Sequence, residues 1–461
     1  MVFSSISFLY LFLPLTLAVY FLCPKAWRNG VLLVASLMFY AFGEPIYVCL
    51  LVLSSLWDYL CSLGIEKHRH DKWAKIFLLA SLAGNLGLLG FFKYFDFFVG
   101  TINGILGTAI PLTGVPLPIG ISFFTFQTMS YTIDVYRGRV KAQRNLATLA
   151  TFVCLFPQLI AGPIVRYIDV EGELENRDSS VEDVALGIRR FAVGLGKKVI
   201  IANSMGQLCT IFRTVDTPTV LFHWMYAVAF CLQIYFDFSG YSDMAIGLGR
   251  MFGFKFPENF NYPYVAKSIT DFWRRWHMTL GGWFRDYVYI PLGGNRTSKV
   301  RWMGNLLIVW GLTGLWHGAS WSFVLWGLYF GIILMVEKLF LGKRLEKAGA
   351  FVQHIYVIFL VIISFVIFNG TDLATIVSDI SGLFGGIPYY NVEAVYYLQS
   401  YGVIFALGIF GALPVAKNLH GKVAQWKVMT LLEPLAVAVL LVVVTAYLVD
   451  GSFNPFLYFR F

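Results

Sequence analysis

The chain has 461 residues, of which 58% are hydrophobic, 18% aromatic and only 13% charged. Together with a mean hydropathy of +0.69, this composition excludes an ordinary soluble domain and indicates a membrane protein. The net charge of +9 is typical of basic loops held against an anionic cytoplasmic leaflet. Membrane lipids, and no nucleic acid, are therefore the expected partners.

Short charged clusters separate long apolar stretches along the whole chain. Hydrocarbon about 30 Å thick is crossed by helices of roughly 20 apolar residues. Residues 1–22 lack the basic n-region and the cleavage site of a signal peptide, so they are predicted to be the first retained span. We predict an all-α polytopic protein, a single transmembrane domain of residues 1–461, with roughly 11 to 13 membrane-embedded helices, some of them re-entrant or broken.

Lysine and arginine are absent from residues 97–136, 214–249 and 369–399. By the positive-inside rule these stretches hold the outer turns, and the basic clusters between them are cytoplasmic. The pattern predicts a multi-pass membrane protein.

Proline residues predict two interruptions in the first half of the chain. Pro45 disfavours helix in the residue before it and splits interval 30–63 into two helices. The apolar run 146–165 is predicted to be broken around Pro157, because a single crossing would leave the next basic segment outside. Such backbone is tolerated only inside protein. Residues 178–198 have the acidic start and basic end of a capped helix at the inner face.

Five polar residues interrupt a later apolar span, namely Gln233, Asp237, Ser239, Tyr241 and Asp243. Two interpretations of the carboxylates stay open. Asp237 and Asp243 either cap helices broken at Gly240, or orient a histidine or substrate.

The most densely charged segment, 268–296, contains His277. Ser268 resembles an N-cap, so a helix over 269–280 is predicted. On that helix Trp273 and His277 share a face, and His277 lies beside Arg274 and Arg275. The alternative is an interfacial amphipathic helix whose arginines meet lipid phosphates.

His317 lies in an apolar hairpin without a charged residue between Arg301 and Glu337. A full charge at membrane depth costs about 2.5 to 3.5 kcal/mol, so an ionisable group there is by default a candidate for function. A histidine in a dry site is well suited to be a general base. The alternative is a neutral histidine hydrogen-bonded between helices.

Small and aromatic residues surround His317 in the sequence. Gly314 and Gly318 are predicted to let other backbone approach closely. Trp316 and Trp321 are predicted to form flat walls beside the imidazole.

A basic, glycine-rich mouth is predicted on the cytoplasmic side, beside the sequence PLGGNR. Its members are Arg274, Arg275, Arg285, Arg296, Lys299 and Arg301. The sequence is not a Walker A loop, but the cations could hold the phosphates of a coenzyme or phosphopantetheine arm; lipid head groups are the alternative. The six cysteines form no CxxC pair, so no metal site is predicted.

Several stretches together closely resemble the membrane-bound O-acyltransferase (MBOAT) family, in the bacterial branch typified by alginate O-acetylation. They are FYAFGEP (39–45), residues 118–138, FPQLIAGPIVRY (156–167), residues 234–264, residues 268–296, GLWHGASW (314–321) and FNPFLYFRF (453–461). The resemblance implies a helical enzyme of a bacterial inner (plasma) membrane, with a tunnel reaching its active site from both faces. It also implies that His317 is the catalytic histidine and His277 the second histidine of the bacterial branch.

Acyl transfer is therefore the expected reaction, with acetyl-CoA or another cytoplasmic thioester as donor and no permanently bound cofactor. His317 would be the base or its electrostatic support, and His277 would position the donor or share the proton. The resemblance implies an extracytoplasmic polysaccharide acceptor, reached through an acetyltransferase-like partner protein. Alternatives are transfer of D-alanine or another acyl group to a cell-wall polymer, a transporter or export channel, and a noncatalytic scaffold.

Overall fold

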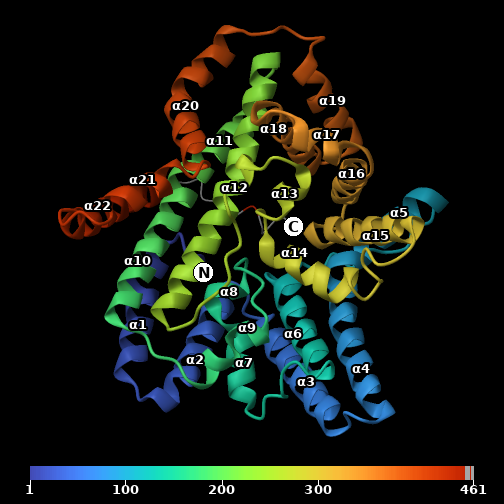
Figure 1. Cartoon of the computed structure of the whole chain (residues 1–461), viewed down its shortest axis with the longest axis vertical. Coiled ribbons are helices and arrows are strands. Elements are labelled where there is room, and N and C mark those ends of the chain that lie inside the picture. Colours follow the sequence, from blue (N-terminus) through green and yellow to red (C-terminus); the bar gives the residue numbers. More distant parts are fainter. Residues whose placement is uncertain (452–456, 458–461) are drawn as a thin grey trace. The chain divides into compact units, whose positions relative to one another are not determined.

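The computed structural model describes residues 1–451 and Leu457 (Figure 1). The remainder of the closing stretch 453–461 lies outside the described residues. Helices and loops make up the described chain, which contains no strand, so the predicted all-α class is confirmed. The chain divides into unit 1, residues 1–191 with 242–257, and unit 2, residues 192–241 with 258–461. The prediction of a single transmembrane domain over residues 1–461 stays a prediction.

Unit 1 contains the first nine α-helices, three short π or 3-10 segments and the first part of α10. The helices are η1 (Phe8–Phe12), α1 (Leu13–Leu22), η2 (Lys25–Trp27), α2 (Arg28–Ala41), α3 (Val48–Lys67), α4 (Lys72–Leu89), η3 (Gly90–Tyr94), α5 (Phe95–Leu106), α6 (Ile121–Tyr136), α7 (Leu146–Cys154), α8 (Phe156–Leu159), α9 (Tyr167–Glu175) and α10 (Val181–Gly196).

Both interruptions predicted in unit 1 are confirmed. Helix α2 ends before Pro45 and α3 begins after it. The run 146–165 is broken into α7 and the four-residue α8, and residues 151–165 are all buried. The broken backbone finds partners inside the unit, because the Phe156 N–H donates to the Ser36 hydroxyl at 3.0 Å. The interruption therefore lies in the protein interior, as its exposed peptide groups require.

A buried polar network joins α3, α4 and α6 of unit 1. The Asp58 carboxylate accepts hydrogen bonds from the Ser81 hydroxyl at 2.5 Å and from the Asn85 amide at 2.9 Å. Thr128 donates to the Asn85 side-chain oxygen at 2.9 Å. These bonds compensate for the burial of polar atoms within an apolar helix bundle.

Unit 2 contains the C-terminal helices and most of α12. Its helices are η4 (Lys197–Ala202), α11 (Asn203–Phe212), α12 (Val220–Met251), η5 (Pro263–Val265), α13 (Ile269–Trp273), α14 (Met278–Phe284), η6 (Arg285–Tyr289), α15 (Lys299–His317), α16 (Trp321–Val336), η7 (Glu337–Leu341), α17 (Gly342–Lys347), α18 (Ala350–Asn369), α19 (Leu373–Phe384), α20 (Val392–Gly411), α21 (Val415–Val423) and α22 (Met429–Asp450).

Helix α12 corrects one prediction, because it runs through Gly240 without a break. A side chain at Gly240 would place its Cβ 2.7 Å from the carbonyl oxygen of Gly194 in α10. The glycine therefore serves close packing of helix backbones instead of a break. Asp237 and Asp243 cap no helix at this point.

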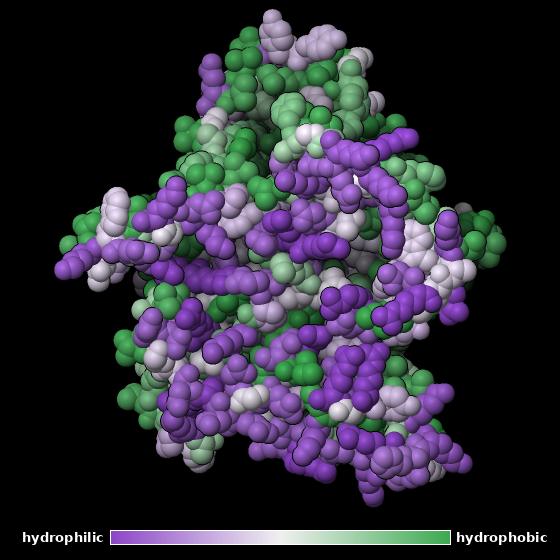
Figure 2. All heavy atoms as spheres, viewed as in Figure 1, coloured by the Kyte–Doolittle hydropathy of each residue, from purple (hydrophilic) through white to green (hydrophobic). Residues whose placement is uncertain are grey.

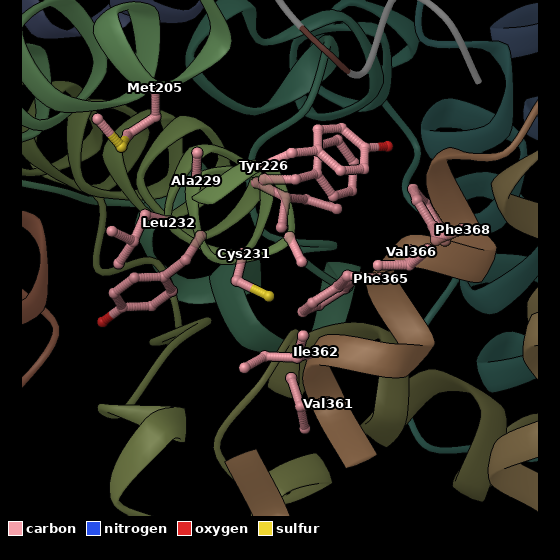
Figure 3. Packing of buried hydrophobic residues seen from close by; sticks show 14 of the residues in the cluster. Met205, Tyr226, Ala229, Cys231, Leu232, Val361, Ile362, Phe365, Val366 and Phe368 are labelled. Carbon is pink, nitrogen blue, oxygen red and sulfur yellow. The ribbon is translucent and has the colours of Figure 1, made fainter. Parts of the chain in front are cut away.

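The core of unit 2 lies between α11, α12 and α18. Figure 3 shows Cys231 and Leu232 of α12 in the same cluster as Ile362 and Phe365 of α18. Phe368, at the end of that helix, is also buried in the cluster. Through Phe368, which also contacts the His317 ring, this cluster supports the aromatic site.

Seven helical stretches of the described chain are long and apolar enough to cross a membrane. They are Val48–Lys67, Lys72–Leu106, Val220–Met251, Trp321–Lys347, Ala350–Asn369, Val392–Gly411 and Met429–Asp450; Phe8–Leu22 and Leu373–Phe384 are shorter apolar helices. Figure 2 shows hydrophobic residues exposed near α19 and α20, where Val377 is 58% and Val403 69% exposed. Lipid-facing surfaces of this kind support a multi-pass membrane protein.

Two contacts in unit 2 are relevant to the predicted topology, which stays a prediction. Asn391 donates to the Thr217 carbonyl oxygen at 3.3 Å, and both residues belong to stretches predicted to face outward. The Lys338 ammonium lies 4.7 Å from the centre of the Trp302 ring; Lys338 belongs to a predicted cytoplasmic cluster, and Trp302 directly follows another.

Candidate active site

The helix predicted over 269–280 is wrong, because the chain breaks immediately before His277. Ser268 caps α13 as predicted and accepts from the Asp271 N–H at 3.0 Å. That helix ends at Trp273, and α14 begins only at Met278. His277 stands between them with φ 45° and ψ 52°, in the left-handed region.

A buried loop residue, Asn259, supplies the physical reason for the break. Its backbone oxygen accepts from the Met278 N–H at 3.0 Å. Its side-chain oxygen accepts from the Thr279 N–H at 3.3 Å and the Thr279 hydroxyl at 2.9 Å. These donors at the start of α14 have no partner in their own helix. Tertiary hydrogen bonds therefore start a second helix where local sequence favoured one continuous helix.

The backbone of His277 is strained. Among the described residues only Tyr262 and His277 combine a side chain with positive φ. Such conformations cost on the order of 1 to 3 kcal/mol and cluster at functional sites. Arg274, Arg275 and His277 all lie between the two helices, so the argument that His277 shares a helix with the arginines loses its basis, and its role in positioning the donor stays a prediction.

The His277 imidazole is enclosed by unit 2 and is only 2% exposed. Its ring lies edge-on to Phe238 at 4.6 Å and to Trp316 at 5.6 Å between centroids. Nδ1 lies 3.1 Å from the Asn259 side-chain oxygen, whereas Nε2 has no hydrogen-bond partner among the described residues. His277 lies outside the seven candidate spans; burial lowers its pKa well below the ordinary value, and His317 lowers it further.

His317 is the last residue of α15 and is 5% exposed. Its ring packs edge-on against Trp316, Trp326 and Phe368, with centroid distances of 5.1, 5.0 and 5.4 Å. The His277 ring lies 6.5 Å away. The two histidines, 40 residues apart in the sequence, are thus neighbours in one aromatic site.

Helices α15 and α16 form a hairpin. It brings these rings together because the backbone of α15 packs closely against that of α16. A Cβ on Gly314 would collide with the Phe323 carbonyl oxygen, and one on Gly318 with the Phe323 ring. The predicted close approach of other backbone is therefore confirmed at Gly314, whereas Gly318 packs against a side chain. The predicted wall at Trp321 is wrong, because this first residue of α16 is 57% exposed. Trp326, more than one turn later, forms that wall instead.

Trp273 belongs to the same aromatic cluster but not to the surface that touches His277. Its ring packs against Trp310 at 4.7 Å, Trp326 at 5.6 Å and Phe330 at 4.8 Å. The predicted shared face of Trp273 and His277 is therefore wrong. Trp326 connects Trp273 to His317 by touching both rings.

The two aspartates predicted to orient a histidine or substrate are engaged elsewhere. Asp237 forms a buried ion pair with Lys198 at 2.5 Å and accepts from the Leu457 N–H at 2.8 Å. Asp243 belongs to unit 1, where Arg190 donates to it at 3.0 Å. These contacts favour structural roles, and a substrate-binding role for either residue stays a prediction.

The two arginines before His277 differ in environment. Arg275, two residues after the end of α13, donates to the carboxylate of Asp271 in that helix at 2.9 Å. Arg274 is exposed, as are Arg296, Lys299 and Arg301. The neighbouring PLGG turn is held by Asn305, whose amide donates to the carbonyl oxygens of Leu292 and Gly294. Of the exposed cations, Arg296, Lys299 and Arg301 therefore follow a fixed turn in the sequence.

Three residues of the site escaped the sequence analysis. Asn259 and Trp326 touch the histidines directly. Glu337 anchors α13, because its carboxylate accepts from the N–H groups of Ile269 and Thr270 at 2.6 and 3.0 Å. A carboxylate is favourable at this positive helix end. The only sequence signal was the isolation of Glu337 after a long charge-free stretch.

This arrangement is suited to moving a proton. The centroid distance of 6.5 Å is too long for a direct hydrogen bond of about 2.9 Å between the two rings. One oxygen atom between them could contact both imidazoles. The aromatic walls exclude water, which strengthens polar interactions with such an atom.

Comparison with known proteins identifies a family and several relatives of this chain. The model of MBOAT, the membrane-bound O-acyltransferase family, matches residues 121–378. A probable alginate O-acetylase AlgI of Pseudomonas putida is 39% identical over 100% of both chains. The peptidoglycan O-acetyltransferase of Helicobacter pylori is 38% identical over 73% of this chain and 70% of its own. The teichoic acid D-alanyltransferase of Bacillus subtilis is 31% identical over 48% of this chain and 59% of its own. The chain belongs to the membrane-bound O-acyltransferase family and is a multi-pass membrane O-acyltransferase.

Proposed function

We propose that this O-acyltransferase moves an acetyl group from cytoplasmic acetyl-CoA across a bacterial inner membrane. The acetyl group then serves the O-acetylation of an extracytoplasmic polysaccharide through a partner acetyltransferase. The observation that carries the proposal is the buried pair His277 and His317, with the unpartnered Nε2 of His277 beside the second imidazole.

The reaction requires a base at the site. An acceptor hydroxyl oxygen attacks the thioester carbonyl carbon, the new C–O bond forms, and the C–S bond breaks. The hydroxyl proton passes to the imidazole pair, and the departing thiolate takes up a proton to become the CoA thiol. His317 acts as the base or its electrostatic support, and His277 shares the proton.

Acetyl is favoured over D-alanyl as the transferred group by the relatives. Two proteins named for O-acetylation match most of this chain at 38 to 39% identity, whereas the D-alanyltransferase matches 48% of it at 31%. The buried site supports the same choice, because the described side chains that contact the two histidines are aromatic rings and the neutral Asn259. None of those contacts supplies a carboxylate for the ammonium group of D-alanine.

The donor is proposed to enter beside the exposed cations of unit 2. Arg274, Arg296, Lys299 and Arg301 are exposed, on segments predicted to be cytoplasmic. Phosphates of CoA are suitable partners for such a cluster. The acetyl end would have to reach the two histidines.

The test uses purified protein in sealed vesicles, with radiolabelled acetyl-CoA on the cytoplasmic side. A candidate partner domain or a soluble polysaccharide is placed on the other side. We expect label to appear covalently on the opposite side and free CoA to accumulate in equal amount. Radiolabelled D-alanyl carrier protein is the matched alternative donor; transfer from it and none from acetyl-CoA would contradict the proposal.

A further inference from the structure

The hydrogen bonds of Asn259 determine which nitrogen of His277 carries the proton. The Thr279 N–H can only donate, and it points to the Asn259 side-chain Oδ1 at 3.3 Å. The Thr279 hydroxyl lies 2.9 Å from the same atom. An amide nitrogen at that position would face a backbone donor, so the oxygen assignment follows from the network.

The assignment of the Asn259 oxygen determines the tautomer of the His277 imidazole. His277 Nδ1 lies 3.1 Å from Asn259 Oδ1, which has no proton to give. Nδ1 must therefore carry the hydrogen and donate it. In a neutral imidazole the other nitrogen then holds a free lone pair. That nitrogen, Nε2, is buried and without a partner among the described residues.

We propose that Asn259 is a positioning residue that holds His277 in the Nδ1–H form, so that Nε2 accepts the proton of the attacking hydroxyl. The proposal rests on the proposed acyl transfer and specifies the part that His277 takes in it. The hydroxyl oxygen bonds to the acyl carbon, its proton moves to Nε2, and the bond from Nδ1–H to Asn259 stabilises the imidazolium that results. Without Asn259 the ring could adopt the other tautomer, whose Nε2 donates and cannot accept a proton.

The backbone geometry supports the same assignment. Asn259 is fully buried, and its main-chain oxygen accepts from Met278, directly after His277. The left-handed backbone of His277 is therefore enforced by the residue that also orients its ring. The other ring neighbours are Phe238, Trp316 and His317, of which only His317 titrates, while the nearby Arg275 pairs with Asp271.

Asn259→Leu removes the acceptor and Asn259→Asp keeps it. We expect kcat in the Leu variant to fall about 10² fold with a nearly unchanged KM for acetyl-CoA, since control of the tautomer affects proton transfer and not donor binding; losing it in a Ser-His-Asp triad costs about 10⁴. The Asp variant should keep substantial activity, and the acid limb of its pH profile should move up by about one unit, because a carboxylate raises the pKa of a neighbouring histidine.

Asn305→Leu is the matched control, since Asn305 is also buried in unit 2 but bonds carbonyl oxygens of the PLGG turn. It should lower thermal stability without moving the acid limb. An Asn259→Leu enzyme that is folded and retains wild-type kcat would overturn the proposal. So would an unmoved acid limb in Asn259→Asp, or an equal shift in the control.

A spectroscopic measurement separates this proposal from the proposed function. Nuclear magnetic resonance of ¹⁵N-histidine-labelled protein, with the His277 signals assigned from His277→Gln, reports the tautomer without any substrate. A protonated Nδ1 in the wild type that is lost in Asn259→Leu supports the proposal even where acetyl-CoA proves not to be the donor. A protonated Nε2 in the wild type overturns it whatever the donor is.

Discussion

Two buried polar pairs of unit 2 differ in how their polar atoms are compensated for the loss of contact with water. Lys198 and Asp237 are 3% and 1% exposed and neutralise each other, with Leu457 as a further donor to the carboxylate. His277 and His317 are equally buried, yet their rings are too far apart to bond each other, and His277 Nε2 has no partner among the described residues. The ion pair stabilises the fold, whereas the unpartnered Nε2 of His277, beside strained backbone, is available to a substrate.

Deleting one member of each pair tests most directly whether the histidine pair serves catalysis and the ion pair serves stability. His317→Ala should lower acyl transfer by about 10² to 10⁴, the usual size of a general-base contribution, with nearly normal folding. Initial rates with radiolabelled acetyl-CoA and thermal unfolding in detergent measure the two effects. A well-folded variant with wild-type turnover would remove His317 from the catalytic role.

Lys198→Met should act on stability instead. It leaves the Asp237 carboxylate buried without its counter-charge, and breaking a buried pair in this way costs about 3 to 5 kcal/mol. The midpoint of thermal unfolding should therefore fall strongly. Lys198→Met combined with Asp237→Asn should recover most of the loss, because no unpaired charge remains and an acceptor for Leu457 is kept. No recovery in the double variant would show that the ion pair is not the source of the effect.

Acid should lower the stability of the folded protein, because protonation of His277 is unfavourable in the folded state. Its folded pKa lies well below that of the unfolded chain, so the unfolded state binds more protons in acid. The stability from neutral His277 is fully present above about pH 6.5, the ordinary pKa, and is lost as pH falls further, at up to about 1.4 kcal/mol per pH unit. Unfolding midpoints measured from pH 8 to 5 should show a weaker acid dependence in His277→Gln than in the wild type.

The smallest expected effect concerns the exposed arginine next to the site. Arg274→Gln should raise the KM for acetyl-CoA a few fold, since an exposed charge contributes about 0 to 1 kcal/mol and is screened by salt. The difference should shrink at high ionic strength. Arg285→Gln is a suitable control, because Arg285 already pairs with Asp286. An equal rise in both variants would mean that the arginines act only through general surface charge.

The amino-acid sequence by itself determined the large features of this protein. Apolar stretches of about 20 residues predict membrane helices. Pro45 marks an interruption because proline restricts the residue before it. The motif around His317 also identified that residue and its two packing glycines, since a histidine in an uncharged hairpin stands out locally. These signals are short-range, so no contact between distant segments was needed to read them.

Only the tertiary structure decided how the site is built. Residues 269–280 have the local pattern of one helix, but hydrogen bonds from Asn259 split it at His277. Separate tertiary contacts place Trp326 instead of Trp321 against His317, and pair Asp237 with Lys198. In each case an interaction between segments far apart in the sequence outweighs a local preference worth about 1 kcal/mol or less per residue. The tautomer of His277 follows from the same contacts and is invisible in its neighbouring residues.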